Sequence, residues 1–254
     1  MNSVNNSIRS LKEQQIKVTE EKKKQLEKKF NEVLFILIGL LTTLSRNSNT
    51  LSKYKQFRII KDIERELVKH RKILVDYQKE FLYETLRNNF NENYNELYMI
   101  LKTFYGNDIK KSTIIEDVIN KIISSKFFDK TLDKRIVDNT TLTFNKINKE
   151  LSNKLVSDNE NTNITTVIIG ALNTNFDSLT KTQKRLLDTE DTRLFNEAQK
   201  KVFRDFGIEN LIWCSVLCEN TCSECANNDG QPFSIEDIDM IPLHSRCNCY
   251  WEIV

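Results

Sequence analysis

The sequence predicts a mostly helical protein that ends in a small α+β module. Its 254 residues include only five glycines and two prolines, and Lys, Glu, Leu and Ile are frequent, a composition typical of long helices. Apolar residues recur at steps of three and four along much of the chain, as on one face of an α-helix. In contrast, all six cysteines and both prolines lie between residues 214 and 249. We therefore expect a long N-terminal antiparallel helical hairpin, further helices, and a C-terminal module with a β-hairpin.

Residues 1–108 are predicted to form the helical hairpin, with helices over residues 4–45 and 51–105. Two long helices joined by a short polar break pair as an antiparallel hairpin. The second helix carries a heptad seam that shifts register near Leu82. Its positions are Ile60, Ile63, Leu67, His70, Leu74, Tyr77 and Phe81, and then Leu86, Phe90, Leu97, Leu101 and Phe104. Within this seam, His70 is expected to be a packed polar residue rather than a ligand.

Residues 109–180 are predicted to be a helical connecting region. The TIIE pattern from Thr113 is a capping box, whereas the Asn- and Ser-rich stretch 138–163 has only weak helical spacing. The following TTVIIGAL fits either a short helix or a strand. A new helix is then expected to begin at a cap formed by Thr180 or Thr182 and to end at Gly207.

Residues 181–254 hold that helix and the C-terminal module. The segment NLIWCSVLC, residues 210–218, is apolar and β-prone, which predicts a strand. Asn228, Asp229 and Gly230 give a turn signal. The QPFSI segment that follows is the expected returning strand of the β-hairpin.

Charge and hydropathy limit the classes of function. With 38 basic and 36 acidic residues, the net charge of +2 gives no strong electrostatic argument for nucleic acid. The longest apolar run, Val33 to Leu44, is shorter than the roughly 20 residues that a membrane-spanning helix needs. The N-terminus lacks the layout of a signal peptide. The cysteines are therefore expected in a reducing compartment, where clustered cysteines indicate metal binding before disulfides.

Four residues in two pairs have the spacing of a metal site. Cys222 and Cys225 form a Cys-x-x-Cys pair, and His244 and Cys247 form a His-x-x-Cys pair further along. Each pair can hold one ion from a tight turn, and three sulfurs and one imidazole complete the tetrahedral set of structural zinc. Such a closed site stabilises a small module rather than catalysing a reaction. We therefore expect a structural zinc site that holds the β-hairpin module together.

Alternatives to this ligand set remain open. Cys249 lies two residues after Cys247 and can replace it as the fourth ligand, although the spacing from His244 favours Cys247. The thiols can also pack without a metal, or form disulfides once the protein leaves the cell. Cys214 and Cys218 are expected to be strand residues with free thiols, because buried cysteine behaves as a small apolar residue.

The C-terminal stretch resembles the phage minor head protein family, also described as Mu F-like head morphogenesis proteins. A Thr-Glu helix that ends in a glycine precedes a Trp, a Thr-Cys-x-x-Cys pair, an Asp-Gly turn with an aromatic residue, and Pro-x-His-x-x-Cys-x-Cys. The resemblance covers residues 180–254 well and the preceding seventy only by helical character. Besides the cysteines and His244, the motif residues are Thr189, Glu190, Trp213, Asp229, Gly230, Phe233 and Pro242.

The resemblance implies a low-copy virion protein without catalytic activity. Such proteins associate with the portal and other head proteins during capsid assembly, and some act in genome packaging or DNA ejection. The implied location is the capsid interior or portal vertex, after assembly in the host cytoplasm. This sequence departs from the family at Asp188, where an Arg is common, at Cys218, where an Asp is common, and at Asn248, where an Arg is common.

Two other functions can be weighed on the sequence. A nucleic-acid-binding zinc module, acting in DNA delivery or packaging, would use the metal site or the lysines between residues 22 and 29 to contact genomic DNA. Those lysines alternate with glutamates, a pattern more typical of a solvated helix face. A metal-dependent nuclease would need an open coordination site with a nearby acid or base, and the predicted site is closed.

Overall fold

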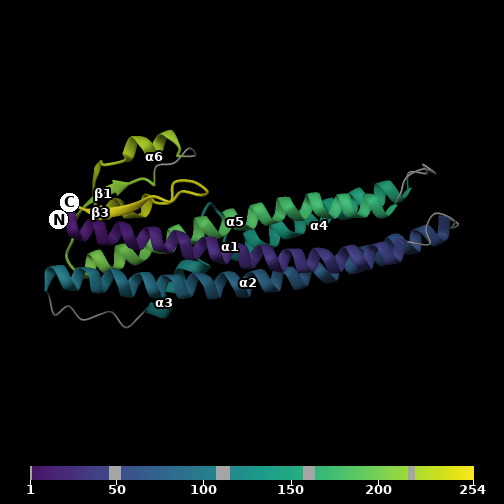
Figure 1. Cartoon of the computed structure of the whole chain (residues 1–254), viewed down its shortest axis with the longest axis horizontal. Coiled ribbons are helices and arrows are strands. Elements are labelled where there is room, and N and C mark those ends of the chain that lie inside the picture. Colours follow the sequence, from purple (N-terminus) through teal and green to yellow (C-terminus); the bar gives the residue numbers. More distant parts are fainter. Residues whose placement is uncertain (1, 46–52, 107–114, 157–163, 217–220) are drawn as a thin grey trace. The chain divides into compact units, whose positions relative to one another are not determined.

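The fold was described from a computed structural model, which describes residues 2–45, 53–106, 115–156, 164–216 and 221–254. It is mostly helical with a small C-terminal antiparallel sheet, which confirms the predicted fold class (Figure 1). The helices are α1 (Asn2–Ser45), α2 (Lys53–Tyr105), α3 (Ile115–Ser124), α4 (Leu132–Val156), α5 (Ile164–Asp205) and α6 (Ser223–Asn228). The strands are β1 (Asn210–Cys214), β2 (Pro232–Ser234) and β3 (Tyr250–Ile253), with a 3-10 helix η2 (Ile235–Met240).

The chain forms two compact units, each built from segments that are distant in sequence. Unit 1 comprises residues 1–23, 82–125 and 185–254, and unit 2 comprises residues 24–81 and 126–184. Helix α2 passes from unit 2 to unit 1 between Phe81 and Leu82. This boundary coincides with the register shift in the heptad seam, so a change in periodicity along one helix marks a change of core.

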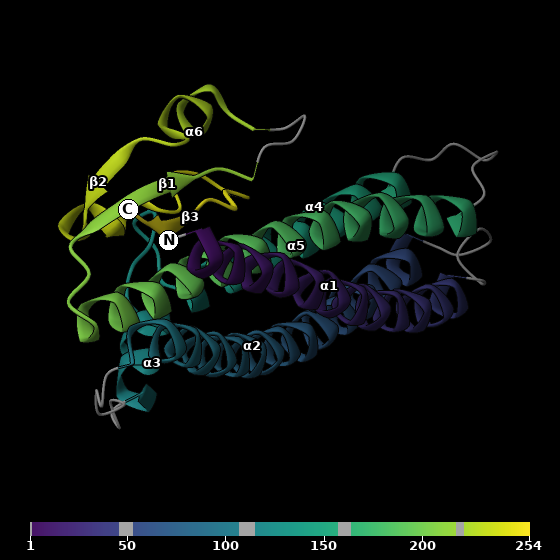
Figure 2. The same cartoon turned by 60° about the vertical axis from the view of Figure 1, so that its left-hand side comes forward.

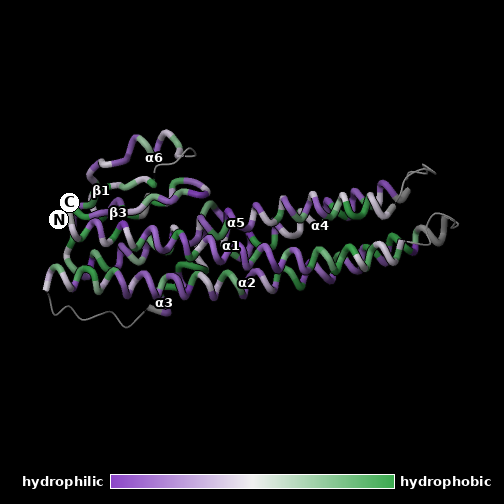
Figure 3. Tube along the Cα trace, in the orientation of Figure 1, coloured by the Kyte–Doolittle hydropathy of each residue, from purple (hydrophilic) through white to green (hydrophobic). Residues whose placement is uncertain are grey.

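Unit 2 has an apolar core shared by parts of four helices. Its fully buried side chains include Leu26, Phe30 and Leu37 of α1, Leu74 of α2, Ile147 of α4, and Ile168 and Leu172 of α5. The hydropathy of these helices alternates along their length, as an amphipathic pattern requires (Figure 3). His70 is buried in α2 with Nδ1 2.9 Å from the Glu66 carbonyl, in agreement with its expected packing role.

Unit 1 has a core that is partly polar. Leu86, Phe90 and Leu97 of α2 are fully buried, as the seam predicts, but Phe104 is exposed. Among them lies Asp191 of α5, whose carboxylate accepts hydrogen bonds from Gln15, Thr19 and Asn89, the last at 2.8 Å. Burial raises the pKa of Asp191. The apolar spacing alone gave no indication of this buried cluster.

The sheet has the strand order β2-β1-β3 and is antiparallel throughout (Figure 2). Strand β1 pairs with β2 through Leu211 and Phe233, and with β3 through Trp213 and Trp251. The predicted hairpin pairing of β1 with β2 is confirmed, but β1 ends at Cys214 rather than at residue 218 within the described residues. In the sequence, helix α6 connects β1 to β2. The third strand, β3, was not predicted.

Helix α5 corrects the expected break near residue 180. Residues 164–205 form one continuous helix, so TTVIIGAL is helical and neither Thr180 nor Thr182 is an N-cap. The Thr182 hydroxyl donates instead to the Ser178 carbonyl at 2.9 Å, which satisfies it within the helix. Gly207 ends the helix as predicted, with φ of 68° and with the Ile208 N–H on the Phe203 carbonyl.

The remaining helix predictions have mixed outcomes. Helix α4 extends through most of the weakly patterned stretch 138–163, because packing of Phe144, Ile147 and Leu151 outweighs low local propensity. The expected capping box at Thr113 and the loop at 157–163 lie outside the described residues. No described helix carries an apolar segment of the length needed to cross a membrane.

Candidate metal centre

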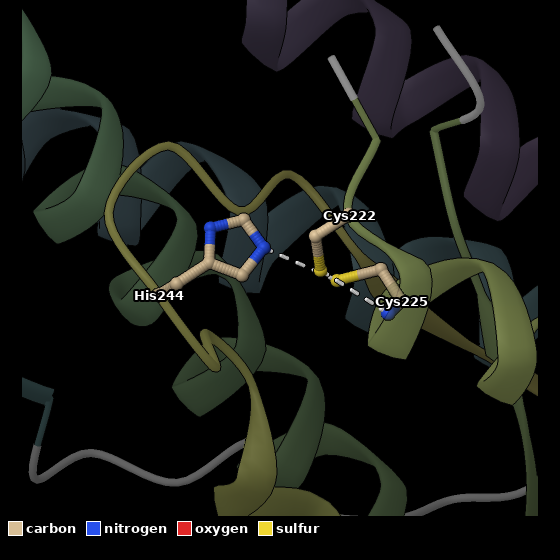
Figure 4. A group of neighbouring side chains, drawn as sticks. All are labelled: Cys222, Cys225 and His244. Carbon is tan, nitrogen blue, oxygen red and sulfur yellow. Dashed lines mark hydrogen bonds between the residues drawn. The ribbon is translucent and has the colours of Figure 1, made fainter.

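Five Cys and His side chains gather in unit 1 as two overlapping groups of three. Cys222, Cys225 and His244 form one group, and Cys225, Cys247 and Cys249 form the other. Within each group the donor atoms lie within 4.8 Å of one another. Cys225 belongs to both groups. Figure 4 shows the His244 ring facing the thiols of Cys222 and Cys225.

The start of α6 positions the first pair. Cys222 is the N-cap, and its Sγ accepts a hydrogen bond from the Cys225 N–H at 3.3 Å. One helical turn thus brings both thiols to the same end of the helix. Cys225 is 2% exposed, and its carbonyl accepts a hydrogen bond from the Ser215 hydroxyl at 2.6 Å. This bond ties α6 to the residue that follows β1.

A tight turn positions the second pair. The Cys247 N–H donates to the His244 carbonyl at 3.2 Å, and Arg246 adopts a left-handed φ of 66° within the turn. His244 Nδ1 lies 2.8 Å from the Ser245 carbonyl, and Nε2 lies 3.3 Å from the Cys225 Sγ. Donation from Nδ1 to this carbonyl leaves the Nε2 lone pair directed at the sulfurs, the tautomer that a metal-bound histidine needs.

The thiols differ in acidity because their surroundings differ. The Cys225 N–H lowers the pKa of Cys222, whereas burial raises the pKa of Cys225 to about 12. A hydrogen bond between the thiols lowers the pKa of Cys247 and raises that of Cys249. Burial alone would lower the pKa of His244. The Ser245 carbonyl and the nearby thiolates together raise it by more than burial lowers it, so the net shift of the pKa is upward.

These donors form a set that can hold a metal ion. The Cys225 and Cys247 sulfurs are 3.9 Å apart, close to the separation of about 3.8 Å expected for two sulfurs bound tetrahedrally at about 2.3 Å from zinc. Coordination requires thiolates and a neutral imidazole. Metal binding therefore displaces protons, above all from Cys225 and His244, and metal affinity is expected to rise with pH.

Among the described cysteines, Cys214 is not part of either group. Cys214 lies on β1, half-buried, with its Sγ 3.8 Å from the Ile212 carbonyl, and burial raises its pKa to about 12. The expectation that it is a strand residue with a free thiol is confirmed. Cys218 lies outside the described residues.

A polar stripe on α5 holds the segment that carries the second pair. Its members follow one another at steps of three and four and so share one helix face. The Arg246 N–H donates to the Thr189 Oγ1 at 3.2 Å, and the Thr192 hydroxyl donates to the Asn248 Oδ1 at 3.1 Å. We call this set the α5 stripe: Thr189, Thr192, Asn196 and Gln199.

The C-terminal half of the α5 stripe satisfies backbone groups of Cys249 and of β3. The Asn196 amide donates to the Cys249 carbonyl at 3.2 Å. Gln199 makes two bonds to Trp251, donating to its carbonyl at 2.7 Å and accepting from its N–H at 3.1 Å. The outer edge of β3 is thereby covered by side chains, as an edge strand requires.

The residues that carry the family resemblance lie around the same centre. The Asp229 carboxylate accepts from the Ser215 N–H at 2.7 Å, and the Gly230 N–H donates to the Trp213 carbonyl at 2.8 Å. Gly230 has φ of 75°, which explains a glycine at this turn. Phe233 completes an aromatic cluster with both tryptophans, at centroid distances of 5.7 and 5.4 Å.

Two further motif residues, Glu190 and Pro242, also have defined structural places. Glu190 is buried and pairs with Arg193 at 3.1 Å. Pro242 follows a cis peptide bond after Ile241, at the start of the segment that leads to His244. Of the three departures from the family, Asp188 pairs with Lys23 and Asn248 receives the bond from Thr192, so both positions have local partners here.

The sequence therefore indicated the clustered Cys and His side chains but not most of the contacts that support them. Ser215, Thr192 and Gln199 were not predicted, although the steps of three and four between the polar residues of the α5 stripe follow one helix face. The contacts of Ser215 join segments 10 residues apart and leave no local pattern.

No protein-family model, curated protein or solved structure matches this chain.

Proposed function

We propose that this chain is a structural, low-copy component of a phage head, and that zinc stabilises its C-terminal module. The observation that carries the proposal is the Cys/His centre, whose donors are nitrogen and sulfur only. Cys222, Cys225 and His244, with Cys247 or Cys249, supply the four ligands of a structural zinc ion. The 3.9 Å separation from Cys225 favours Cys247 as the fourth ligand.

The assignment to a phage head rests on the resemblance of the C-terminal motif. Several of its residues, including Thr189, Glu190 and Trp213, are buried, whereas Asp229 and Gly230 form an exposed turn. Trp213 and Trp251 are fully buried and meet edge to face at 5.2 Å. Each of these contacts stabilises the module, and none of them resembles catalytic machinery, which suits a protein that binds portal and head proteins rather than a substrate.

Copy number in particles tests the assignment. Quantitative mass spectrometry of purified, nuclease-treated phage particles should find a few copies of this polypeptide for each portal ring. A pull-down with purified portal protein should retain the full chain. Absence from particles together with failure to bind portal protein would overturn the proposal, whatever the metal content.

Metal analysis tests the zinc assignment separately. The protein purified from zinc-supplemented cells should contain one zinc per chain, and Cys222→Ser should lose it. Cys214→Ser is the matched control, because Cys214 belongs to neither donor group, and it should keep the full zinc content. Zinc retained by Cys222→Ser would contradict the assignment of ligands.

The alternative, a nucleic-acid-binding zinc module, has less support. Lys23 and Lys29 of the lysine-rich segment pair with Glu20 at 2.6 Å and Glu32 at 3.0 Å. Phosphate contacts would make retention on DNA fall steeply with salt. Retention on DNA at low salt that is lost steeply at high salt would support the nucleic-acid-binding alternative.

A further inference from the structure

We propose that Cys225, Cys247 and Cys249 form a second metal site of sulfur ligands only, which selects a soft monovalent ion such as Cu(I). The inference rests on the proposed zinc centre because it shares Cys225 with it, and also Cys247 where Cys247 is the fourth zinc ligand. A bound Cu(I) ion would therefore displace zinc rather than join it.

The geometry of the five donors motivates this second site. The described residues of the cluster supply one donor more than a tetrahedral ion uses, and these donors fall into two groups of three, not one group of five. In the second group every donor is a thiol. Three sulfurs at about 2.3 Å from a trigonal ion lie about 4.0 Å apart, and Cys225 and Cys247 are already 3.9 Å apart.

The two groups differ in their chemistry. The first contains an imidazole and two half-exposed residues, Cys222 and His244, whereas Cys225, Cys247 and Cys249 are each at most 3% exposed. Thiolate ligands select soft ions such as Cu(I), while a mixed imidazole and thiolate set suits zinc. Burial also excludes the water that would complete the coordination of a harder ion.

The charge around the second group suits an anionic centre. Three thiolates and one monovalent cation carry a net charge of −2. Lys12 of α1 is buried, and its Nζ has no hydrogen-bond partner among the described residues. It lies 4.8 Å from the centre of the Phe195 ring. Burial lowers the pKa of Lys12 to about 8, and the charges of Asp191, Cys247 and Cys249 oppose that shift, so below about pH 8 this ammonium group can balance part of the thiolate charge.

The second group is also held rigidly. Asn196 fixes the Cys249 carbonyl at 3.2 Å, and the Cys249 thiol lies 3.6 Å from the Ser215 hydroxyl. The same hydroxyl holds the Cys225 carbonyl. Two of the three cysteines, Cys225 through its carbonyl and Cys249 through its thiol, are therefore tied to Ser215, which helps to fix their positions before any ion binds, as an efficient site requires.

Metal affinities of single variants of the full chain test the proposal. Zinc and Cu(I) dissociation constants are measured without oxygen by competition with a chromophoric chelator for each ion. Cys249→Ser should weaken Cu(I) binding at least tenfold, whereas Cys222→Ser should weaken zinc binding at least tenfold and change Cu(I) binding less than threefold. Cys225→Ser should weaken both. Adding one equivalent of Cu(I) to the zinc protein should release one zinc.

The outcomes separate this inference from the zinc assignment. If Cys222→Ser and Cys249→Ser weaken Cu(I) binding equally, there is no distinct second site and the inference fails while zinc can still bind. If the wild-type chain binds Cu(I) through Cys249 but no zinc, the zinc assignment fails and the soft site stands. Cys249→Ala is a second variant at this position, which controls for misfolding that the buried serine hydroxyl of Cys249→Ser would cause. The near-ultraviolet circular dichroism of the tryptophans verifies the fold of each variant.

Discussion

The cores of unit 2 and unit 1 are stabilised by different kinds of side chain. The core of unit 2 is built mainly from Leu, Ile, Val and Phe side chains that fill the space between helices, and the polar side chains buried there, such as Gln78 and Thr140, are uncharged. Unit 1 buries Asp191, Glu190, Arg193 and Lys12 as well as three cysteines. Apolar packing depends on volume and tolerates changes of partner, whereas buried polar groups need particular partners in particular places. The difference suggests that unit 2 is a generic scaffold and that unit 1 holds a specific centre.

The largest expected effect comes from removing the shared ligand of the metal centre. Cys225→Ser should weaken metal binding strongly and destabilise the C-terminal module, because the apparent binding energy of a structural zinc site is on the order of 10 kcal/mol and appears as folding energy. Both tryptophans of the chain are in the sheet of unit 1, so their near-ultraviolet signal should collapse while the far-ultraviolet helical signal stays largely intact.

A strong chelator should act on wild-type protein as Cys225→Ser does. Melting curves followed at the tryptophans should differ between chelator and zinc, and identical curves would show that no metal stabilises the module. Cys214→Ser should melt like the wild type.

A cavity made in the core of unit 2 should lower the free energy of unfolding without changing zinc affinity. Leu37 is fully buried in the apolar core, so Leu37→Ala should lower the free energy of unfolding by about 3 kcal/mol and leave zinc affinity unchanged. Leu40→Ala is the matched control, since Leu40 is 38% exposed and should cost less than about 1 kcal/mol. Denaturant titrations followed by far-ultraviolet circular dichroism measure both. A loss of zinc affinity in Leu37→Ala would show that the two units are not energetically separate.

The buried Lys12 should make the stability of unit 1 depend on alkaline pH. Burial lowers the pKa of Lys12 from 10.5 to about 8, so the unfolded chain binds the proton more tightly between these values. Stability of the wild type should therefore rise with pH from about 8 to 10.5, relative to Lys12→Met, by on the order of 1 kcal/mol per pH unit.

Denaturant midpoints of both proteins across this range provide the measurement for Lys12. Taking the difference between the two proteins removes the titration of the cysteines from the comparison. Parallel pH profiles would mean that Lys12 keeps its ordinary pKa in the folded protein.

The hydrogen bonds of the α5 stripe should contribute less to the stability of unit 1 than the Cys/His cluster, but more than an exposed ion pair does. Gln199→Ala removes two buried hydrogen bonds to Trp251 and should cost about 2 to 3 kcal/mol, because buried backbone groups are left without partners. Asn5 makes the equivalent pair of bonds to Ile253, at 2.8 and 3.0 Å, in a half-buried position. Asn5→Ala should cost about 1 kcal/mol, since water can replace the lost partner. Thermal melts followed at the tryptophans should rank the two variants in this order.

The smallest effect is expected at an exposed ion pair of unit 2. Lys61 and Glu64 are 2.9 Å apart on the surface of α2, and such pairs contribute at most about 0.5 kcal/mol. Lys61→Gln should therefore leave the denaturant midpoint almost unchanged. A larger effect would indicate that unit 2 also depends on specific polar contacts.

Local patterns in the sequence determined the helices, their buried faces and the residues of the Cys/His cluster. Steps of three and four identify Leu67, Leu74 and Phe90 as buried, because helical periodicity is a property of adjacent turns. The register shift at Leu82 even marks the boundary between the two cores. The Cys-x-x-Cys and His-x-x-Cys spacings identify the clustered Cys and His side chains for the same reason, since each pair lies within one turn.

Only the tertiary structure decided which distant groups meet. The division of ligands into two groups with Cys225 in common, the third strand, and the burial of Lys12 and Asp191 depend on contacts between residues far apart in the chain. The break expected at Thr180 disappears in α5 because packing along a continuous helix outweighs a weak capping preference. Spacing along a chain determines what one turn or one face can present, whereas the partners of a buried charge or a spare thiol depend on the whole fold.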